Sequence, residues 1–236
     1  MEHSTIGPIG TVIAQALEAS GVDVASLFAE VGLDVASLRD PNVRIPTETM
    51  LQLIRKADAA SNDPAFGLSL SQYVHPTTFY SLGIAMYSSD TLRDFLARYV
   101  KYYRLITTND SLQAEESDGL YRMTATPISE LDTVPTRVDG FAALTTKIIR
   151  NATDEHFAPA HVALARPNPD GLEQRYLDYF LCPVEFDAPL TVLTLRSEQL
   201  DLALPTANPE LTRMYEEITQ DYLAKIDKAD FPRRVQ

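Results

Sequence analysis

Residues that could ligate a metal or act as a nucleophile are few and scattered along this sequence. It has 4 histidines, and its single cysteine is Cys182. A zinc site would need His156 and His161, which flank the segment FAPA, to converge with further ligands. A cysteine nucleophile would need a positioned base. Because the sequence indicates neither arrangement, we expect no metal site and interpret Cys182 as a small buried hydrophobic residue.

Sequence motifs of the common enzyme classes are absent. The chain has no glycine-rich phosphate loop, no G-x-S-x-G nucleophile motif and no H-E-x-x-H zinc motif. Its paired carboxylates, such as Glu115 with Glu116, are adjacent in sequence and so point in different directions. We therefore predict no catalytic residues, no cofactor and no enzymatic activity. The alternative is an enzyme of unrecognised type, which would need titratable groups with perturbed pKa values in one cleft.

The most distinctive feature is a segment rich in tyrosine and arginine, DTLRDFLARYVKYYRLIT, at residues 90–107. On a helical wheel its apolar and aromatic side chains share one arc, while Arg93, Lys101 and Arg104 lie on the opposite side. The pattern has three interpretations: an ordinary amphipathic helix with core tyrosines, a helix that grips nucleic acid, or one wall of a ligand pocket. A phenol suits a pocket because its ring supplies apolar contact area and its hydroxyl a directional hydrogen bond.

The preceding segment, VHPTTFYSLGIAMYSS at residues 74–89, also carries aromatic residues on one helical face. A glycine inside a helix costs about 1 kcal/mol relative to alanine unless close packing or a ligand needs the space. We therefore expect the two segments to direct aromatic faces toward a common centre over the hairpin that follows. Arg122 or Arg104 is able to pair a ligand carboxylate there, with an ordinary surface ion pair as the alternative for each. The candidate ligand-binding residues are Phe79, Tyr80, Gly83, Tyr87, Tyr99, Tyr103 and Arg122.

The hydrophobic period divides the chain into a helical front half and a region with strands. From residue 9 to about 106 the apolar residues recur with helical spacing. After Thr107 they alternate on either side of the dipeptide Asp118-Gly119, which is typical of a β-hairpin. Further strand-like runs alternate with helices, and residues 211–228 have the pattern of an amphipathic helix. We predict an α+β fold: a helical N-terminal half packed on an antiparallel sheet of about four strands, with a C-terminal amphipathic helix.

The charge balance argues against nucleic-acid binding by this chain. Its 20 basic residues stand against 33 acidic ones, which gives a formal net charge of −13, and such a chain repels a phosphate backbone. A single cysteine agrees with a reducing compartment. The sequence has neither a basic, apolar leader nor an apolar run long enough to span a bilayer. We expect a cytoplasmic protein that makes no contact with a membrane.

Four segments of the chain, in their order, resemble one protein family. They are DPNVRIPTETMLQLIRKA at 40–57, NDPAFGLSL at 62–70, TTFYSLGIAMYSSDTLRDFLARYVKYYRLIT at 77–107 and YLDYFLCPVEFDAPLTVLTL at 176–195. Together they resemble the N-terminal effector-binding domain, labelled arabinose-binding, of AraC-type transcriptional regulators, in the branch typified by ornithine-responsive regulators. The label is not literal here, because the sugar-binding jelly roll consists of strands, whereas this sequence is rich in helices.

The resemblance implies a cytoplasmic bacterial regulator whose N-terminal domain binds a small-molecule effector and forms a homodimer. DNA would be bound by a C-terminal pair of helix-turn-helix units, which we expect to follow DFPRRVQ and to be missing from this sequence. We accordingly assign residues 1–206 to the effector-binding domain and residues 207–236 to a linker or dimerisation helix. The alternative is a dimerisation or protein-interaction module without a ligand, and a core with no cavity above water size would favour it.

Overall fold

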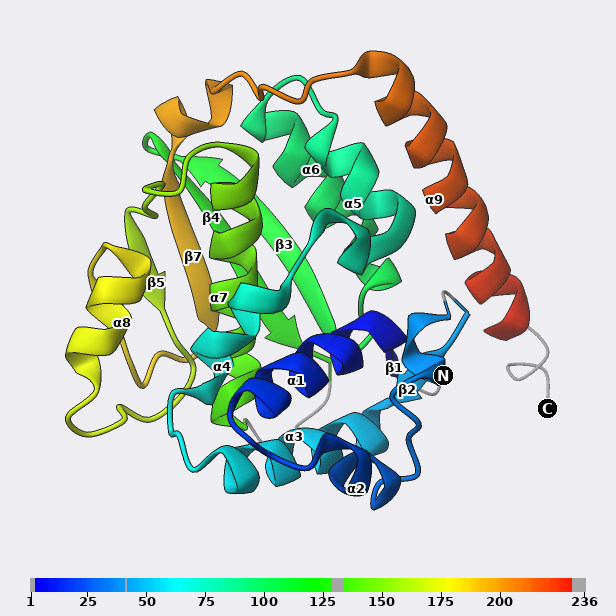
Figure 1. Cartoon of the computed structure of the whole chain (residues 1–236). Helices are drawn as coiled ribbons and strands as arrows, with labels where there is room; N and C mark the ends of the chain where they lie inside the picture. The colour runs from blue at the N-terminus through cyan, green and yellow to red at the C-terminus, as the bar shows by residue number, and fades with distance from the viewer. Residues whose placement is uncertain (1–2, 41, 129–133, 231–236) are drawn as a thin grey trace.

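The computed structural model describes residues 3–40, 42–128 and 134–230 (Figure 1). The N-terminal half is helical and the C-terminal half contains a sheet. The elements of the first half are β1 (Ser4–Ile6), α1 (Gly7–Ala19), α2 (Val24–Ala29), η1 (Ser37–Arg39), β2 (Arg44–Pro46), α3 (Thr47–Ser61), α4 (Phe66–Ser69), η2 (Leu70–Tyr73), η3 (Pro76–Phe79), α5 (Tyr80–Tyr87), α6 (Leu92–Tyr102) and η4 (Tyr103–Leu105). Those of the second half are β3 (Asp110–Ser117), β4 (Leu120–Pro127), α7 (Pro135–Ala152), β5 (His161–Ala163), α8 (Glu173–Phe180), β6 (Val184–Glu185), β7 (Thr191–Arg196), η5 (Ser197–Asp201) and α9 (Pro209–Asp230).

The sheet differs from the predicted one in size and direction. It has five strands in the order β3-β4-β7-β5-β6, and β5 pairs with β6 in parallel while the other neighbours are antiparallel. The prediction of about four antiparallel strands is one strand short and did not include the parallel pairing of β5 with β6. It also missed the separate pairing of β1 with β2, whose strands are three residues long. The α+β class, the helical front half and the C-terminal helix are confirmed.

The β3–β4 hairpin forms where the sequence predicts it. Asp118 and Gly119 occupy the turn with φ of 54° and 74°, the left-handed conformation that a tight two-residue hairpin turn requires. Leu112 then pairs with Ala125 across the strands, and both are buried. The register therefore places one face of the hairpin against the helices.

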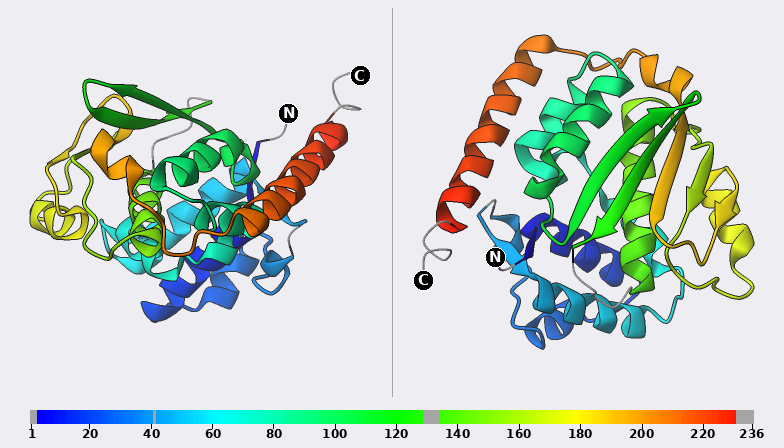
Figure 2. Two further views of the ribbon diagram at one scale, coloured as in Figure 1. Left: turned by 90° about the horizontal axis from the view of Figure 1, so that it is seen from above. Right: turned by 180° about the vertical axis from the view of Figure 1, so that it is seen from behind.

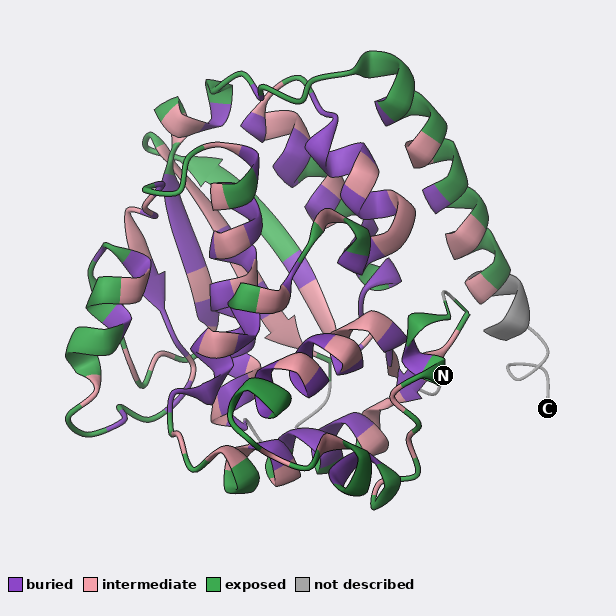
Figure 3. Ribbon diagram, viewed as in Figure 1, coloured by how far each residue is buried: buried purple, intermediate pink, exposed green. Residues whose placement is uncertain are grey.

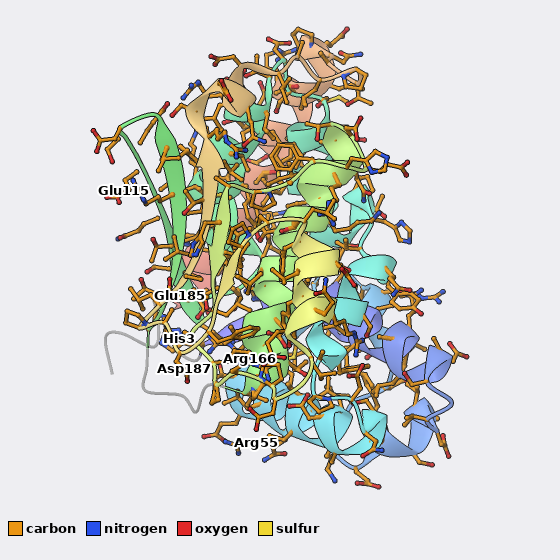
Figure 4. All side chains as sticks on the ribbon, turned by 90° about the vertical axis from the view of Figure 1, so that its left-hand side faces the viewer. His3, Arg55, Glu115, Arg166, Glu185 and Asp187 are labelled. Atoms are coloured by element: carbon orange, nitrogen blue, oxygen red, sulfur yellow. The ribbon has the colours of Figure 1, made fainter. Side chains whose placement is uncertain are left out.

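Helices cover one face of the sheet and leave the other open (Figure 2). Met123, Leu193 and Leu195 lie on the covered face and are fully buried. On the open face Glu115 pairs in register with Arg122, and Glu115 projects away from the helices (Figure 4). Only the covered face of the sheet therefore borders the interior of the domain, and side chains of the open face meet solvent.

The buried apolar residues form two clusters (Figure 3). The first, which we call the sheet core, joins α5, α6 and α7 to the sheet through residues such as Phe95 and Leu193. The second, the N-terminal core, joins α1, α2 and α3 through residues such as Leu17 and Leu53. Ile9 and Leu144 pack against both clusters. The domain is thus built from two cores that meet along α1 and α7.

Helix α9 packs along α5 at one side of the molecule (Figure 1), and side chains of α6 contact its Glu216. Ser81 and Thr219 share a hydrogen bond of 2.8 Å, and the rings of Tyr80 and Tyr222 are 6.4 Å apart. The predicted segment 207–236 thus contains a helix at Pro209–Asp230, and residues 231–236 lie outside the described residues. Within the described part of the chain, no helix is long and apolar enough to cross a bilayer.

Candidate functional site

A cavity lies where the two cores meet. Its volume is about 110 Å³, and a single water needs about 10–15 Å³, so the space admits several heavy atoms of a small molecule. Helices α1, α3, α6 and α7 form most of the wall, and β3 contributes only its first residue. The aliphatic part of the lining is Ile9, Ile13, Met50, Leu51, Ile54, Leu70, Ile106 and Leu144.

A chain of four aromatic rings forms one side of this cavity. Phe79 and Tyr99 lie 6.4 Å apart, Tyr99 and Tyr103 meet edge to face at 5.5 Å, and Tyr103 meets Phe141 in the same way at 6.2 Å. All four residues line the cavity. Edge-to-face pairs fix the orientation of each ring, so the aromatic wall has a defined shape.

The two cavity tyrosines differ in their hydrogen bonding. Tyr99 shares a hydrogen bond of 3.1 Å with Thr145, whereas the Tyr103 hydroxyl has no hydrogen-bond partner among the residues that the structure describes. Burial raises the pKa of both phenols, and for Tyr103 the nearby Tyr99 and Asp110 raise it further. Both side chains therefore remain neutral, and the Tyr103 hydroxyl keeps its donor free for a ligand.

An ion pair stands at the polar end of the cavity. Arg137, in the first turn of α7, donates through Nη2 to Asp110 Oδ1 at the start of β3. Burial raises the pKa of Asp110, although the charge and hydrogen bond of Arg137 oppose that rise. Together with Phe141, the pair also lines a neighbouring cavity of about 120 Å³. The three side chains therefore form the partition between two hollow spaces.

Comparison with known proteins assigns the chain to a family. Residues 21–204 match the family described as the arabinose-binding domain of AraC transcription regulators, N-terminal. The chain belongs to this family. The resemblance found in the sequence is thereby confirmed, and the family is one of transcription regulators rather than of enzymes.

Two proteins of Pseudomonas aeruginosa show how this AraC-type domain relates to longer regulators. The chain is 28% identical over 208 residues to the ornithine utilization regulator, a match that covers 88% of this chain and 61% of the relative. It therefore spans less than two thirds of that relative's length. The crystal structure of the transcriptional regulator CdpR shares the fold, with a TM-score of 0.56 at 19% identity over 64% of this chain and 50% of that one.

Three of the predicted ligand-binding residues in this AraC-type domain lie together at the cavity: Phe79, Tyr99 and Tyr103. Arg122 lies on the open face of the sheet, away from them, and donates to the Ser117 hydroxyl at 3.0 Å. Its position follows from the strand period, because Met123 beside it is turned inward. The sheet therefore contributes Asp110 to the cavity instead of the hairpin arginine.

The remaining predicted residues, Tyr80, Gly83 and Tyr87, have other neighbours. Tyr80 donates to the carbonyl of Asp40 at 3.0 Å, and Tyr87 donates to the carbonyl of Ile148 at 3.1 Å. A Cβ on Gly83 would stand 1.7 Å from the carbonyl oxygen of Pro76. Close backbone packing, which was one of the two reasons considered for a glycine in this helix, thus accounts for Gly83.

Sequence reasoning missed most of the cavity wall. Ile13, Leu51 and Ile54 reach it from α1 and α3, and their helical pattern is that of any core residue. Arg137 offered a weak indication of its role. A cation in the first turn of a helix is disfavoured by the helix dipole, so its presence there suggests a compensating contact nearby. That contact is made with Asp110.

A second buried polar cluster lies on another face of α7. Asp139 Oδ2 accepts hydrogen bonds from Arg166 and, at 2.7 Å, from Tyr176, while its Oδ1 atom has no partner among the described residues. Burial raises the pKa of Asp139 to about 6 in spite of the Arg166 charge. This cluster ties α7 to α8 and to the segment before it. Among the described residues, no group of three or more side chains is placed to hold a metal ion.

Helix α6 connects the cavity to α9. While Tyr99 faces the cavity, Tyr102 donates to Glu216 of α9 at 2.6 Å. Arg98 and Lys101 contact the same carboxylate at 3.1 and 3.0 Å. A displacement of α6 by a ligand would therefore change the contacts that hold α9.

Proposed function

We propose that this chain is the part of an AraC-family regulator that binds a small metabolite in the cavity between the two cores and controls a DNA-binding domain lying beyond residue 236. The observation that carries the proposal is a cavity of about 110 Å³ walled by aromatic rings from two successive helical segments. A solid core would have favoured a module without a ligand. Tyr103 is 7% exposed and its hydroxyl has no hydrogen-bond partner among the described residues, so it adds a polar group to which a ligand would bond.

The proposed mechanism is a population shift. A ligand changes an equilibrium only by as much as it prefers one of the two states. Here it would contact α1 and α3 of the N-terminal core and α6 and α7 of the sheet core, so it would favour the packing in which these helices enclose it. Because three side chains of α6 contact the carboxylate of Glu216 in α9, the position of α9 would change with that packing.

In this proposal residues 1–206 form the effector-binding domain, and α9, within residues 207–236, is the linker that also joins two copies of the chain. Its outer face carries Leu211, Met214 and Ile218, which are 38, 42 and 47% exposed. Their spacing places them on one helical stripe, which suits an isologous contact between two copies. Two copies held in this way would set the spacing of two DNA-binding domains in a cytoplasmic regulator. With a net charge of −13, the chain by itself is expected not to bind operator DNA.

A thermal-shift screen of metabolites tests the proposed ligand site. The variant Leu51→Phe adds volume inside the cavity wall, and Leu177→Phe makes the same change at an exposed position of α8. A true effector is expected to raise the Tm of the wild type and of Leu177→Phe but not that of Leu51→Phe. If no compound stabilises the chain, or if stabilisation survives in Leu51→Phe, the cavity is not the effector site. The function left is then dimerisation or protein interaction without a ligand.

A further inference from the structure

The polar end of the cavity offers more hydrogen-bond donors than acceptors. An arginine carries five N–H groups, and within the described residues Arg137 uses Nη2 for Asp110 and has no other acceptor. The Tyr103 hydroxyl likewise has no partner there. The other polar groups at this end bond to protein, since Tyr99 is paired with Thr145 and Thr136 with Asp58. The free donors therefore belong to Arg137 and Tyr103.

The acceptor that Arg137 already has, the Asp110 carboxylate, lies where burial disfavours its ionised form. Asp110 is largely buried, and burial raises the pKa of its carboxyl despite the arginine beside it. Both side chains of the pair also face the neighbouring cavity, which leaves room for Asp110 to share the guanidinium with a second anion. A guanidinium can bind two oxygen acceptors at once in a fork.

Apart from the ion pair, no charged side chain among the described residues lines the cavity, and the polar residues Thr5, Thr107 and Asn109 of its wall are hydrogen-bonded to one another. Most of the other lining side chains are apolar, among them Ile9, Ile13, Leu51, Ile54 and Leu70. A charged tail placed against these side chains would lose its hydration without compensation. The compatible molecule therefore has its polar group at one end and a compact hydrocarbon body at the other.

We propose that the cavity recognises a small carboxylic acid with an uncharged apolar body, the carboxylate bound by Arg137 and by the Tyr103 hydroxyl. This inference rests on the proposed function, because it names the chemical class of the effector at the same site. An amino group beside the carboxylate is compatible with the site, since it would lie near Asp110. Both α-amino acids with apolar side chains and simple aliphatic or aromatic acids share the required chemistry.

Matched acids and amides test the inference on the unmodified chain. Titration calorimetry would compare phenylacetate with phenylacetamide and 3-methylbutanoate with 3-methylbutanamide, and phenylalanine and leucine would be the amino-acid arm. Each acid is expected to bind about tenfold or more tightly than its amide, because hydrogen bonds to charged groups are the stronger ones. If the amino acids bind more tightly than the simple acids, the natural effector is an α-amino acid with an apolar side chain. If the simple acids bind more tightly, it is an aliphatic or aromatic acid without an amino group.

Variants separate this inference from the proposed function. Arg137→Gln is expected to weaken the acids about tenfold or more, Tyr103→Phe a few-fold, and Arg122→Gln, on the open face of the sheet, not at all. Leu51→Phe is expected to abolish binding. If a compound binds in a way that Leu51→Phe abolishes, while acid and amide bind equally and Arg137→Gln changes nothing, the carboxylate inference fails and the proposed function stands. If no acid, amide or amino acid of this panel binds, the carboxylate inference fails as well.

Discussion

Tyr102 of α6 donates its hydroxyl to Glu216 of α9 at 2.6 Å, while Tyr103, the next residue, lines the cavity between the two cores. Two adjacent tyrosines thus face α9 and the cavity, the two parts of the molecule that the proposed mechanism couples. Helix α6 ends at Tyr102 and continues as the 3-10 turn η4. That change of geometry lets consecutive side chains take up these separate positions.

The Glu216 carboxylate is expected to hold α9 in place. Burial opposes its ionisation, but the hydrogen bonds from Tyr102 and Lys101 and the charge of Arg98 outweigh that effect and lower its pKa. Glu216→Ala removes these contacts and should lower the stability of α9 in its packed position by about 1–2 kcal/mol. This corresponds to a roughly 5- to 30-fold larger population of the opened helix. Hydrogen exchange of the α9 amides measures this change. Glu217→Ala is the control because, among the described residues, Glu217 pairs only within α9, with Arg213. Equal exchange in the two variants would show that Glu216 does not anchor the helix.

Gly83 is expected to tolerate no side chain. A Cβ there would stand 1.7 Å from the carbonyl oxygen of Pro76, which is backbone and cannot rotate away. Gly83→Ala should destabilise the fold by about 3 kcal/mol or more. At Gly140 the nearest atom is the flexible end of Leu70 at 3.2 Å, so Gly140→Ala should stay within about 1 kcal/mol of the wild type because alanine also favours the helix. Urea unfolding compares the two, and a similar loss in both would refute the backbone clash.

Asp139 is expected to make the protein less stable as the pH rises through 6. Its pKa is about 6 in the folded chain because of burial, against about 3.9 for an unfolded aspartate. The folded state therefore keeps a proton that the unfolded state has already lost, so the stabilisation is complete below pH 4 and disappears as the pH passes 6. The change is at most about 3 kcal/mol, from about two pKa units of 1.36 kcal/mol each.

Comparison with Asp139→Asn isolates this carboxyl from Asp58 and Asp110, whose pKa values are also raised by burial. The stability of the wild type relative to Asp139→Asn should fall between pH 4.5 and pH 7.5 in urea unfolding. Asp178→Asn, on the exposed part of α8, controls for the loss of one carboxylate. A constant difference between wild type and Asp139→Asn across this range would contradict the raised pKa.

The exposed stripe of α9 is expected to join two copies of the chain. Ile218→Glu places a charge on the stripe formed by Leu211, Met214 and Ile218, where it would lose hydration in a dimer. Sedimentation equilibrium should show at least about tenfold weaker self-association. Ala224→Glu adds the same charge on another exposed part of α9 and should leave the association unchanged. A monomeric wild type, or equal association in both variants, would remove α9 from the dimer contact.

The sequence allowed local features to be predicted well. Asp118-Gly119 identified the hairpin because its turn conformation depends on those two residues. The aromatic arc of residues 90–107 placed Tyr99 and Tyr103 on the same inward face, and both line the cavity. Helical spacing alone decides which residues share a face. Cys182 is buried, as expected for a small hydrophobic residue.

Features that depend on distant parts of the chain could not be predicted in the same way. The opposite wall of the cavity comes from α1, α3 and α7, and nothing in the pattern of Ile13 or Leu51 distinguishes a cavity residue from a core residue. The pairing of Val162 with Val184 in β5 and β6 joins strands too short to show a period. The strand pattern around Arg122 and the helical pattern around Arg137 do not show which of the two arginines faces a cavity. The packing of α7 against β3 decides that it is Arg137.

Binding of a small molecule between the two cores is best examined in a crystal structure of the chain with the compound that stabilises it most. We expect ligand density enclosed by Phe79, Tyr103 and Ile54, with the polar end of the ligand at Arg137. Density for the ligand at any other place, such as the open face of the sheet or the outer side of α9, would contradict this expectation.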